Sequence, residues 1–581
     1  MSRVAHRART PLVIVVAFFG LLILTALLPW LTGREPAYAV LRAREREREA
    51  TPELIESIRQ VHDLPTTPWE SLAAWFSGLL RLDFGTSWVN PRQAALPAAL
   101  EGVGITAALT ASALAFALVA SLLCVVPHIS YRLRHDRDSN TVAAQILAAW
   151  AALPDFVVAV LLLWWFAVQW QLLPVGGWAS PAHMVLPTIA LGLAAAGMYG
   201  RVLLISADAA VAEPWVQSWR SNGVAHPILV RHVAWRAFLP TVSQLTLFFA
   251  GIISGTAAIE VTFNIDGFGR TVVDSATSGD IPVLQAAVTF VLLLGILTGL
   301  LAHLVRARVA RRLSGTQAVA ARRRLASTRR LASTRRLGTV AVLVAAVPLL
   351  LVLAGIGRSS EINTSQRFAA PSLAHPLGAD QLGRDIWARL ADGFFYTIGA
   401  ALLVTLACGV IALVLGHLGP WVQHLGDAMN ALPSILLGLV LAGVFGRSML
   451  TAAIAVLLVG WIPLAAHCAA VVSEVASSGH YQYAQMLGAC RWHLLTHHVL
   501  PTTVPAVARH AVGRIAHNAI ALAALGFLGV GAAVGSPDWG VILNEAAGYL
   551  ERAPWMALGP MVALVSLGVA ATVATDRLLA R

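Results

Sequence analysis

Long apolar runs recur along the whole chain, and they constrain its fold more than any other feature. Each run covers about 20 residues, which at 1.5 Å per residue matches a hydrocarbon core about 30 Å thick. Of the 581 residues, 57% are hydrophobic and only 12% are charged. Several soluble domains would need far more charged surface than this. We therefore predict an all-α polytopic membrane protein.

About twelve such runs are present, in two groups of six. The predicted spans are 11–31, 99–126, 143–172, 184–206, 241–262, 282–304, 338–356, 393–418, 430–446, 450–472, 506–530 and 555–577. Between the groups, residues 307–337 contain Arg-Arg-Leu-Ala-Ser-Thr twice in tandem. Such a basic, repetitive segment cannot bury a core, so we expect a flexible or surface-lying linker that acts as a plain spacer; contact with anionic lipid headgroups is the alternative. The predicted halves are 1–306 and 338–581.

The net charge of +12 comes from arginines that gather between the apolar runs. They include Arg3, Arg7 and Arg9, then Arg132, Arg134 and Arg137, and a cluster from Arg306 to Arg336. This distribution follows the positive-inside rule and argues against nucleic-acid binding. It places both termini in the cytoplasm and the segment 33–97 in the periplasm. The first run is longer than the core of a usual signal peptide, so we expect a retained helix, with cleavage as the alternative.

The sequence shows no enzymatic site. It contains no GxxxxGK[ST] phosphate loop, so the chain is not expected to bind or hydrolyse ATP. The four cysteines lie apart without CxxC spacing, which predicts buried, unreactive thiols rather than disulfides or a zinc site. His497 and His498 are adjacent and do not share a helix face, so no metal site is predicted there.

Two loops at equivalent places form an internal repeat. The first contains Gly223, Arg231-His232 and Leu239-Pro240, and the second contains Gly488, His497-His498 and Leu500-Pro501. Each lies between the fourth and fifth predicted spans of its half, on the cytoplasmic side. Two related halves are the expected architecture of an alternating-access transporter.

These loops resemble the EAA loops of ATP-binding cassette (ABC) importer permeases. Flanking segments resemble one class, the importers of dipeptides, oligopeptides and nickel. His375–Asp385 resembles the HPLGTDxLGRD segment of the C-type subunit, and 527–529, 536–540 and 554–555 resemble its end. Segments 83–87, 173–177 and 267–270 resemble the B-type subunit. The resemblance covers nearly the whole chain, with the B-type subunit first and the C-type subunit fused behind it.

The resemblance implies two six-helix halves of the type I importer fold. It also implies that short helices at about 213–222 and 479–487 dock into clefts on ATPase subunits, which fits helix-in-groove recognition. The docking residues implied are Trp215, Arg220, Gly223, Arg231, His232, Pro240, Tyr481, Ala484, Gly488, His498 and Pro501. Expected partners are two ABC ATPase subunits or one fused ATPase, a periplasmic or lipid-anchored substrate-binding protein, and membrane lipid. ATP and magnesium would bind to the ATPases, and this chain would hold no cofactor.

The sequence departs from the family pattern at several positions. Trp219 stands where the family usually has a small residue, and Gln482 and Tyr483 stand where Glu and Ala are usual. These changes imply an altered cleft on the partner ATPase, or else a non-transporting relative with decayed loops. The family commonly carries a Glu near Leu522, and only Glu260 of the first half keeps the matching charge.

The eleventh predicted span carries an unusual stripe of polar side chains. His510, Arg514 and His517 fall at i, i+4 and i+7 on one helix face, with Asn518 beside them. Ionisable residues at membrane depth are costly and usually face a cavity or a partner. The resemblance implies that this span and the one with Glu260 line the translocation pathway, where cations would attract a carboxylate or an anionic metal chelate. The alternative is that the arginine snorkels to the cytoplasmic interface.

The periplasmic segment His375–Asp385 has two interpretations. It can receive the substrate-binding protein, or it can be a structural loop in which Asp380, Arg384 and Asp385 pair internally. Trp164, Trp165 and Trp170, near a span end, are interpreted as interfacial anchors.

The predicted function is the permease component of an importer for di- or oligopeptides, in the bacterial cytoplasmic membrane. Nickel or a metal chelate is the second choice of substrate. An ion-coupled secondary transporter is a less favoured alternative, because few carboxylates apart from Glu260 lie within the spans. A membrane scaffold or sensor would need a soluble signalling domain, which the sequence lacks.

Overall fold

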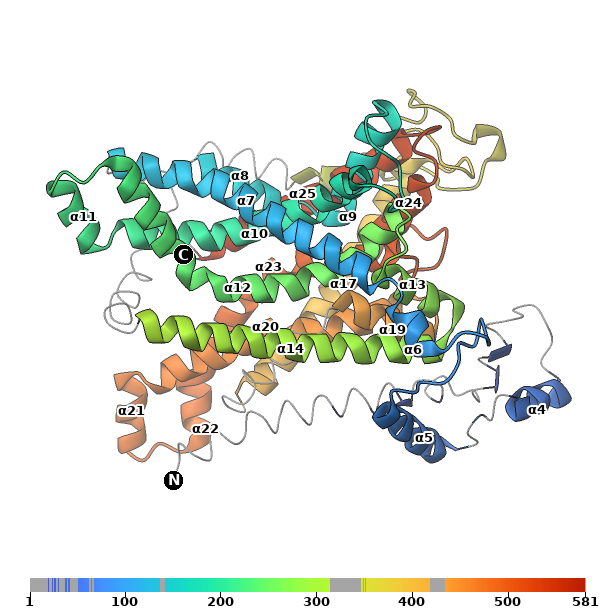
Figure 1. Cartoon of the computed structure of the whole chain (residues 1–581), viewed down its shortest axis with the longest axis horizontal. Coiled ribbons are helices and arrows are strands. Elements are labelled where there is room, and N and C mark those ends of the chain that lie inside the picture. The colour runs from blue at the N-terminus through green and yellow to red at the C-terminus, as the bar shows by residue number, and fades with distance from the viewer. Residues whose placement is uncertain are drawn as a thin grey trace. The chain divides into compact units, whose positions relative to one another are not determined.

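The described residues are helical, as predicted (Figure 1). The computed structural model describes residues 51–61, 67–135, 142–313, 352–417 and 434–579, with a few single residues outside these ranges. Within this part no strand is present, only two isolated β-bridges, Thr86 with Ala94 and Ala379 with Asp385.

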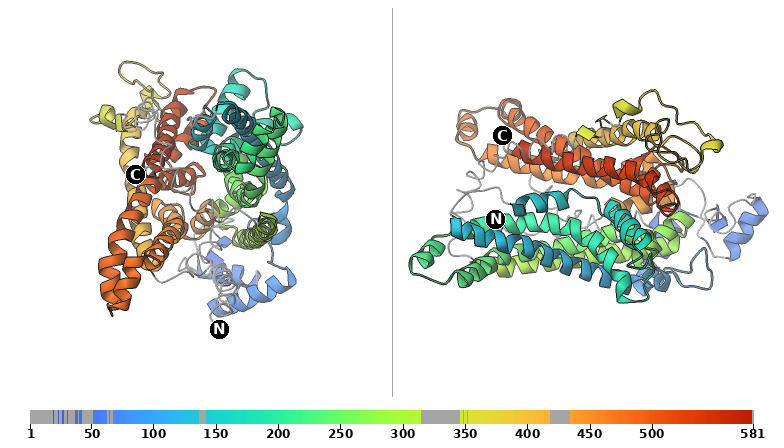
Figure 2. Two further views of the ribbon diagram at one scale, coloured as in Figure 1. Left: turned by 90° about the vertical axis from the view of Figure 1, so that its left-hand side faces the viewer. Right: turned by 90° about the horizontal axis from the view of Figure 1, so that it is seen from above.

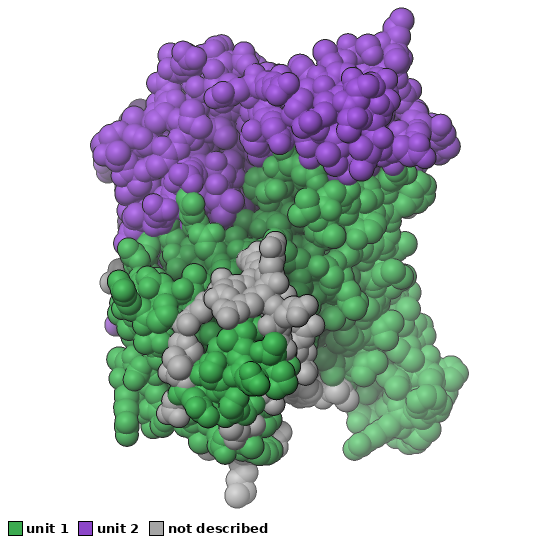
Figure 3. Space-filling model, turned by 90° about the vertical axis from the view of Figure 1, so that its right-hand side faces the viewer, with its two compact units in different colours: residues 1–103, 267–295, 392–545 green, residues 104–266, 296–391, 546–581 purple. Residues whose placement is uncertain are grey.

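The chain forms two compact units, and each combines segments from both sides of the predicted linker (Figure 3). Unit 1 comprises 1–103, 267–295 and 392–545, and unit 2 comprises 104–266, 296–391 and 546–581. The boundary of the halves at the linker stays a prediction, because 314–345 lie outside the described residues. Residues 307–313 of the predicted linker are helical, since α14 (Ile281–Leu313) continues to Leu313.

Unit 2 is built around the long helices α7 (Val103–His135), α10 (Pro181–Val211) and α12 (His226–Thr262). Its other helices are α8 (Val142–Ala151), α9 (Asp155–Leu162), the π-helix η1 (Leu163–Gln169), α11 (Pro214–Ser221) and α25 (Trp555–Leu579). The helix α10 packs against both α8 and α12, and these helices can be followed in two further views (Figure 2). Their buried apolar side chains, with those of α7, form one core cluster.

The third predicted span, 143–172, is broken in the structure. The helices α8 and α9 meet at a bend of 93°. Pro154 precedes α9, and a proline lacks the N–H that a continuous helix needs and disfavours helical geometry at the residue before it. The last helix of the chain, α25, packs on this break: a Cβ on Gly568 would overlap the carbonyl of Ala152, so only glycine permits the approach.

Unit 1 holds most of the second predicted half together with segments of the first. Its helices are α4 (Pro52–Val61), α5 (Pro68–Arg81), α6 (Ala95–Leu100), α13 (Phe268–Ser278), the start of α14, most of α17 (Ile386–Gly416), α19 (Ser434–Phe445), α20 (Met449–Ala476), α21 (Gly479–Met486), α22 (Arg491–Leu494), the π-helix η4 (Leu495–Val499), α23 (Leu500–Phe527) and α24 (Trp539–Ala547). The helix α20 packs against α19 and α23, and α13 packs on α19. Arg447 Nη2 donates to the carbonyl of Thr277 at 3.2 Å, which joins the two halves within this unit.

Six described helices are long and apolar enough to cross a membrane. They are Ala95–His135, Pro181–Val211, Ile281–Thr298, Ile386–Gly416, Met449–Ala476 and Trp555–Thr572, and the bent pair α8 and α9 can form a seventh span. The predicted spans 241–262, 430–446 and 506–530 correspond to α12, α19 and α23. Most of 11–31 and the first half of 338–356 lie outside the described residues.

Candidate functional site

The first predicted docking loop contains a short helix where the sequence places one. The helix α11, Pro214–Ser221, lies within the predicted 213–222 and connects α10 to α12. Val216 is buried in the core of unit 2 and fixes one face of α11. Gly223 then turns the chain with φ of +72°, a left-handed conformation that side chains disfavour and glycine accepts.

Bulky side chains in this loop pack on the protein itself. Glu213 accepts a hydrogen bond from Trp215 Nε1 at 2.6 Å and an ion pair from Arg236 Nε at 3.2 Å. The Trp219 ring packs edge-on against Trp215 and against His232, with centroids 5.2 Å apart in each case. The tryptophan that replaces a small residue is therefore part of the internal packing of the loop.

The second predicted docking loop has the same backbone conformation as the first, but its side chains pack differently. The helix α21, Gly479–Met486, matches the predicted 479–487, and Gly488 follows with φ of +83°. No side chain of α21 is buried. Large exposed apolar side chains gather here instead, with exposed fractions between 62% and 78%: Tyr483, Met486, Leu487 and Trp492.

Four histidines lie close together in the second loop. The rings of His493 and His497 stack with centroids 4.2 Å apart, and those of His480 and His498 stack at 5.6 Å. Among the described residues, no group of three or more His, Cys, Asp or Glu side chains is arranged to hold a metal ion. The cluster therefore packs the loop together through stacked rings.

The predicted docking residues fall into an exposed set and a partly buried set, and each loop contributes to both. The exposed ones are Arg220, Gly223, Arg231, Pro240, Gly488 and Pro501, and the partly buried ones are Trp215, His232, Tyr481, Ala484 and His498. Pro240 lies inside α12, whereas Pro501 lies at the start of α23. The docking role of these residues remains a prediction.

The predicted pathway residues of the second half share one continuous helix, α23. Asn518 is 1% exposed, and its Nδ2 donates to Thr405 Oγ1 of α17 at 2.9 Å. His510 and Arg514 are partly buried, while His517, which lies on the same helix face as both, is exposed. Successive side chains point about 100° apart on a helix, which separates His517 from Asn518.

The sequence did not reveal two side-chain contacts of α23. The ring of His467, on α20, stacks on His510 with centroids 4.9 Å apart and an interplanar angle of 22°. Near the start of α23, Thr503 Oγ1 lies 3.2 Å from His417 Nε2. Residues so far apart in the chain carry no spacing signal, so only the packing of the helices reveals them.

The predicted pathway residue of the first half, Glu260, is fully buried in unit 2. It lies on α12, and Thr106 Oγ1 of α7 donates to its Oε1 at 2.6 Å. A buried carboxyl group that receives a hydrogen bond fits the expectation that polar groups inside a membrane bundle find partners. Sequence reasoning did not identify Thr106.

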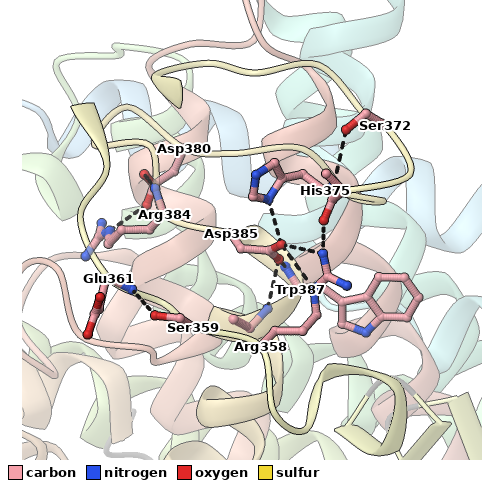
Figure 4. Close-up of polar contacts among 11 residues, drawn as sticks. Arg358, Ser359, Glu361, Ser372, His375, Asp380, Arg384, Asp385 and Trp387 are labelled. Atoms are coloured by element: carbon pink, nitrogen blue, oxygen red, sulfur yellow. Dashed lines mark hydrogen bonds and ion pairs between the residues drawn. The ribbon is translucent and has the colours of Figure 1, made fainter. Parts of the chain in front are cut away.

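The segment 375–385 forms a folded cap that directly precedes α17, and its polar contacts are drawn in Figure 4. Asp380 is 1% exposed and accepts from Arg384 Nε at 2.7 Å and from Arg389 Nη1 at 2.8 Å. Its other oxygen accepts from the backbone N–H groups of Leu382 and Arg384 at 2.8 and 2.9 Å. The predicted internal pairing of Asp380 with Arg384 is confirmed, and Arg389 is a partner that the sequence did not reveal.

Asp385 pairs differently from the prediction. Its Oδ2 lies 2.9 Å from Arg358 Nη2 and 2.8 Å from His375 Nδ1, and its Oδ1 accepts from the N–H of Ala388 at 3.1 Å, which caps α17. Burial alone would raise the pKa of Asp385, but the hydrogen bonds and the Arg358 charge outweigh it and lower that pKa. The carboxylate is thus held ionised at the first turn of the helix.

Two segments of the chain, residues 134–315 and 410–581, match the family described as binding-protein-dependent transport system inner membrane component. Each segment contains one of the two docking loops. The matched segments together cover more than half of the chain.

Curated relatives are transport permeases from several bacteria. The dipeptide transport system permease protein DppC of Alkalihalophilus pseudofirmus is 32% identical over 247 residues, 39% of this chain and 79% of the relative. The metal-staphylopine import system permease protein CntB of Staphylococcus aureus is 29% identical over 306 residues, 52% of this chain and 94% of the relative. The glutathione transport system permease protein GsiD of Pectobacterium atrosepticum is 32% identical over 203 residues, 33% of this chain and 67% of the relative.

Proposed function

The chain belongs to the family of binding-protein-dependent transport system inner membrane components. We propose that it is the permease component of an ABC importer for di- or oligopeptides, with a B-type and a C-type subunit fused in one chain. One observation supports this most: each family segment contains a short helix ended by a left-handed glycine, between two long helices. A single chain therefore carries both docking elements that such an importer needs.

The two docking helices would transmit rigid-body motion between the membrane helices and the ATPases. Two ABC ATPase subunits, or one fused ATPase, would bind ATP and magnesium and engage α11 and α21. A periplasmic or lipid-anchored binding protein would deliver the substrate. With the arginine clusters inside, both termini would lie in the cytoplasm of a bacterial cell.

The names of the relatives, which specify dipeptide, glutathione and metal-staphylopine transport, support our choice of substrate class. We favour di- or oligopeptides and retain nickel or a metal chelate as the second candidate. Glu260 in the first half and the stripe of His510, Arg514, His517 and Asn518 in the second are the proposed pathway residues. We disfavour an ion-coupled secondary transporter, because the family is one of binding-protein-dependent transport systems.

Co-purification tests the docking proposal. The chain, tagged at its C-terminus, is expected to bring down ABC ATPase subunits, and Gly223→Leu or Gly488→Leu is expected to reduce that association. Gly279→Leu is the matched control: its φ is +78°, a Cβ there would also meet open space, and it ends α13, which belongs to neither loop. All three substitutions strain the backbone equally, so only docking separates them.

If the intact chain purifies without any ATPase, or if Gly279→Leu weakens association as much as the loop variants, the docking proposal is wrong. The substrate proposal is tested by uptake of labelled di- and tripeptides into proteoliposomes that contain the assembled complex and its binding protein. Competition by nickel or metal chelates, without competition by peptides, would instead support the second candidate.

A further inference from the structure

The helices α17, α20 and α23 enclose a line of polar side chains inside unit 1. His510 of α23 stacks on His467 of α20, and two turns further along α23 Asn518 bonds to Thr405 of α17. Between them lies Arg514. The three helices approach closely at Gly460 of α20, where an added Cβ would lie 3.0 Å from Cys408 Sγ and 3.7 Å from Asn518 Oδ1.

Two buried polar atoms in this line lack a partner within the described part of the chain. One is Nε of Arg514, a charged donor, and the other is Oδ1 of Asn518, an acceptor. Asn518 is 1% exposed, so water outside the bundle does not reach it freely. Leaving such groups unsatisfied in a membrane bundle is costly, which favours a role for them in binding.

The surrounding helices supply no compensating negative charge. Apart from Asp392 and Glu474 near the helix ends, α17, α20 and α23 contain neither Asp nor Glu. The nearest basic side chains add to the positive charge when protonated, since His467 and His510 lie one turn away. A buried cation without a carboxylate among these helices is suited to an anionic ligand.

The spacing of the two unpartnered atoms also limits how far apart the polar groups of that ligand can lie. Residues four apart on a helix are separated by about 6 Å along its axis. An extended peptide covers at most about 3.3–3.6 Å per residue, so a carboxylate and an N–H about two residues apart span this distance. The C-terminal end of a short peptide has this combination of an anion and a hydrogen-bond donor.

We propose that Arg514 and Asn518 form a substrate subsite, in which the Arg514 guanidinium binds a carboxylate and Asn518 Oδ1 accepts an N–H of the same molecule. This inference rests on the proposed function and specifies the substrate further, as a molecule with a free carboxylate. The stacked pair of His467 and His510 closes the cytoplasmic side of the subsite.

The competing explanation is that Arg514 snorkels to the interface. Arg514 lies 14 residues into α23, about 21 Å along the helix from its start, at 1.5 Å per residue. Arg509 lies closer to the cytoplasmic end, is exposed, and donates its Nε to the carbonyl of Pro505 at 3.3 Å. Arg509 has the surroundings expected of a snorkelling side chain, and it is therefore the matched control.

Equilibrium dialysis tests the subsite directly. The purified complex in lipid nanodiscs, without the binding protein, is incubated with radiolabelled trialanine or with trialanine amide. Because a charge-assisted hydrogen bond is lost with the carboxylate, trialanine is expected to bind about tenfold to a hundredfold more tightly than the amide. Arg514→Gln is expected to abolish this preference, Arg514→Lys to keep part of it, and Arg509→Gln to leave it unchanged.

A second variant separates binding from folding. Asn518→Asp preserves the size of the side chain but gives Arg514 an internal anionic partner. If the subsite binds a carboxylate, this variant is expected to lose trialanine binding while its thermal stability stays equal or rises. A purely structural role for the stripe predicts unchanged binding.

The subsite proposal is wrong if the wild-type complex binds both peptides equally or neither, or if Arg514→Gln binds trialanine like the wild type. The proposed function is judged separately, by ATPase association and ATP-driven uptake. An assembled complex that takes up trialanine equally well with Arg514→Gln contradicts only the subsite. Failure to associate with ATPases contradicts the proposed function and leaves the dialysis result to decide the subsite.

Discussion

Substituting Asp380 by asparagine is expected to loosen the folded cap formed by residues 375–385, just before α17. The Asp380 carboxylate is 1% exposed and contacts the guanidinium groups of Arg384 and Arg389, which are also buried. Asparagine has nearly the same size, and its oxygen can still accept from the backbone N–H of Leu382. The substitution therefore removes one negative charge and presents an amide to two cations.

The magnitude follows from the burial of this pair. Breaking a buried ion pair by removing one partner costs about 3–5 kcal/mol, because a charge remains in a poorly solvated place. At about 1.4 kcal/mol per tenfold change, the opening equilibrium of the segment would rise by about two to three and a half orders of magnitude. An exposed ion pair would change it by less than about tenfold.

Hydrogen exchange measures that opening equilibrium. The chain in lipid nanodiscs is labelled at pH 7, and protection is compared for peptides that cover 358–390. In the wild type the backbone amides of Leu382 and Arg384 donate to the Asp380 carboxylate. The Asp380→Asn variant is expected to lose hydrogen-exchange protection at these two amides. Glu361→Gln is the matched control, since Glu361 is exposed and lies in the same segment.

Protection in Asp380→Asn within about fivefold of the wild type would refute the reasoning. It would show that the guanidinium groups find other partners at little cost. Equal loss of protection in the Glu361→Gln control would show that the segment responds to any lost charge, and that burial of Asp380 is not the cause.

Three further predictions concern other contacts. Gly383→Ala is expected to destabilise the cap by more than about 1 kcal/mol, because Gly383 has φ of +76° and a Cβ would overlap the carbonyl of Asn363; thermal unfolding measures the loss. The stability difference between the wild type and Asp385→Asn is expected to stay constant from pH 8 to 5. The pKa of Asp385 is lower in the folded chain than its unfolded value of 3.8. The ionised carboxylate therefore stabilises the fold at any pH above 3.8, and this stabilisation is lost as the pH falls towards the folded pKa. Melting curves recorded over a series of pH values measure the loss. Thr106→Val is expected to cost about 1–3 kcal/mol because it removes a donor from buried Glu260, whereas Thr106→Ser is expected to restore the melting temperature.

The sequence was sufficient to locate most of the helices. Apolar runs of membrane length and glycines after short amphipathic segments have local signatures, and both docking helices lie where they were expected. Pro154 could have predicted the break in the third span, because a proline interrupts a helix. The apolar residues on both sides of Pro154 made 143–172 look like one continuous span instead. Helix position is a local property, and local patterns predict it.

Side-chain partners between helices were not predictable in the same way. The stacking of His467 on His510 and the bond from Thr106 to Glu260 depend on how each helix is rotated about its axis. A rotation of 100° moves the contact to the next residue, and no spacing within one helix specifies its neighbour's rotation. The pairing of Asp385 with Arg358 has the same origin, because a turn 27 residues away supplies the arginine.

The departures of the docking loops from the family pattern do not by themselves indicate decay. A decayed loop would be free to lose the left-handed turn that ends its helix, because that turn strains any residue except glycine. Both loops keep it, with φ of +72° at Gly223 and +83° at Gly488. What differs is the surface: Trp219 packs inside its loop, whereas Tyr483 is 62% exposed. The two loops therefore share a backbone conformation and differ in the side chains that they expose.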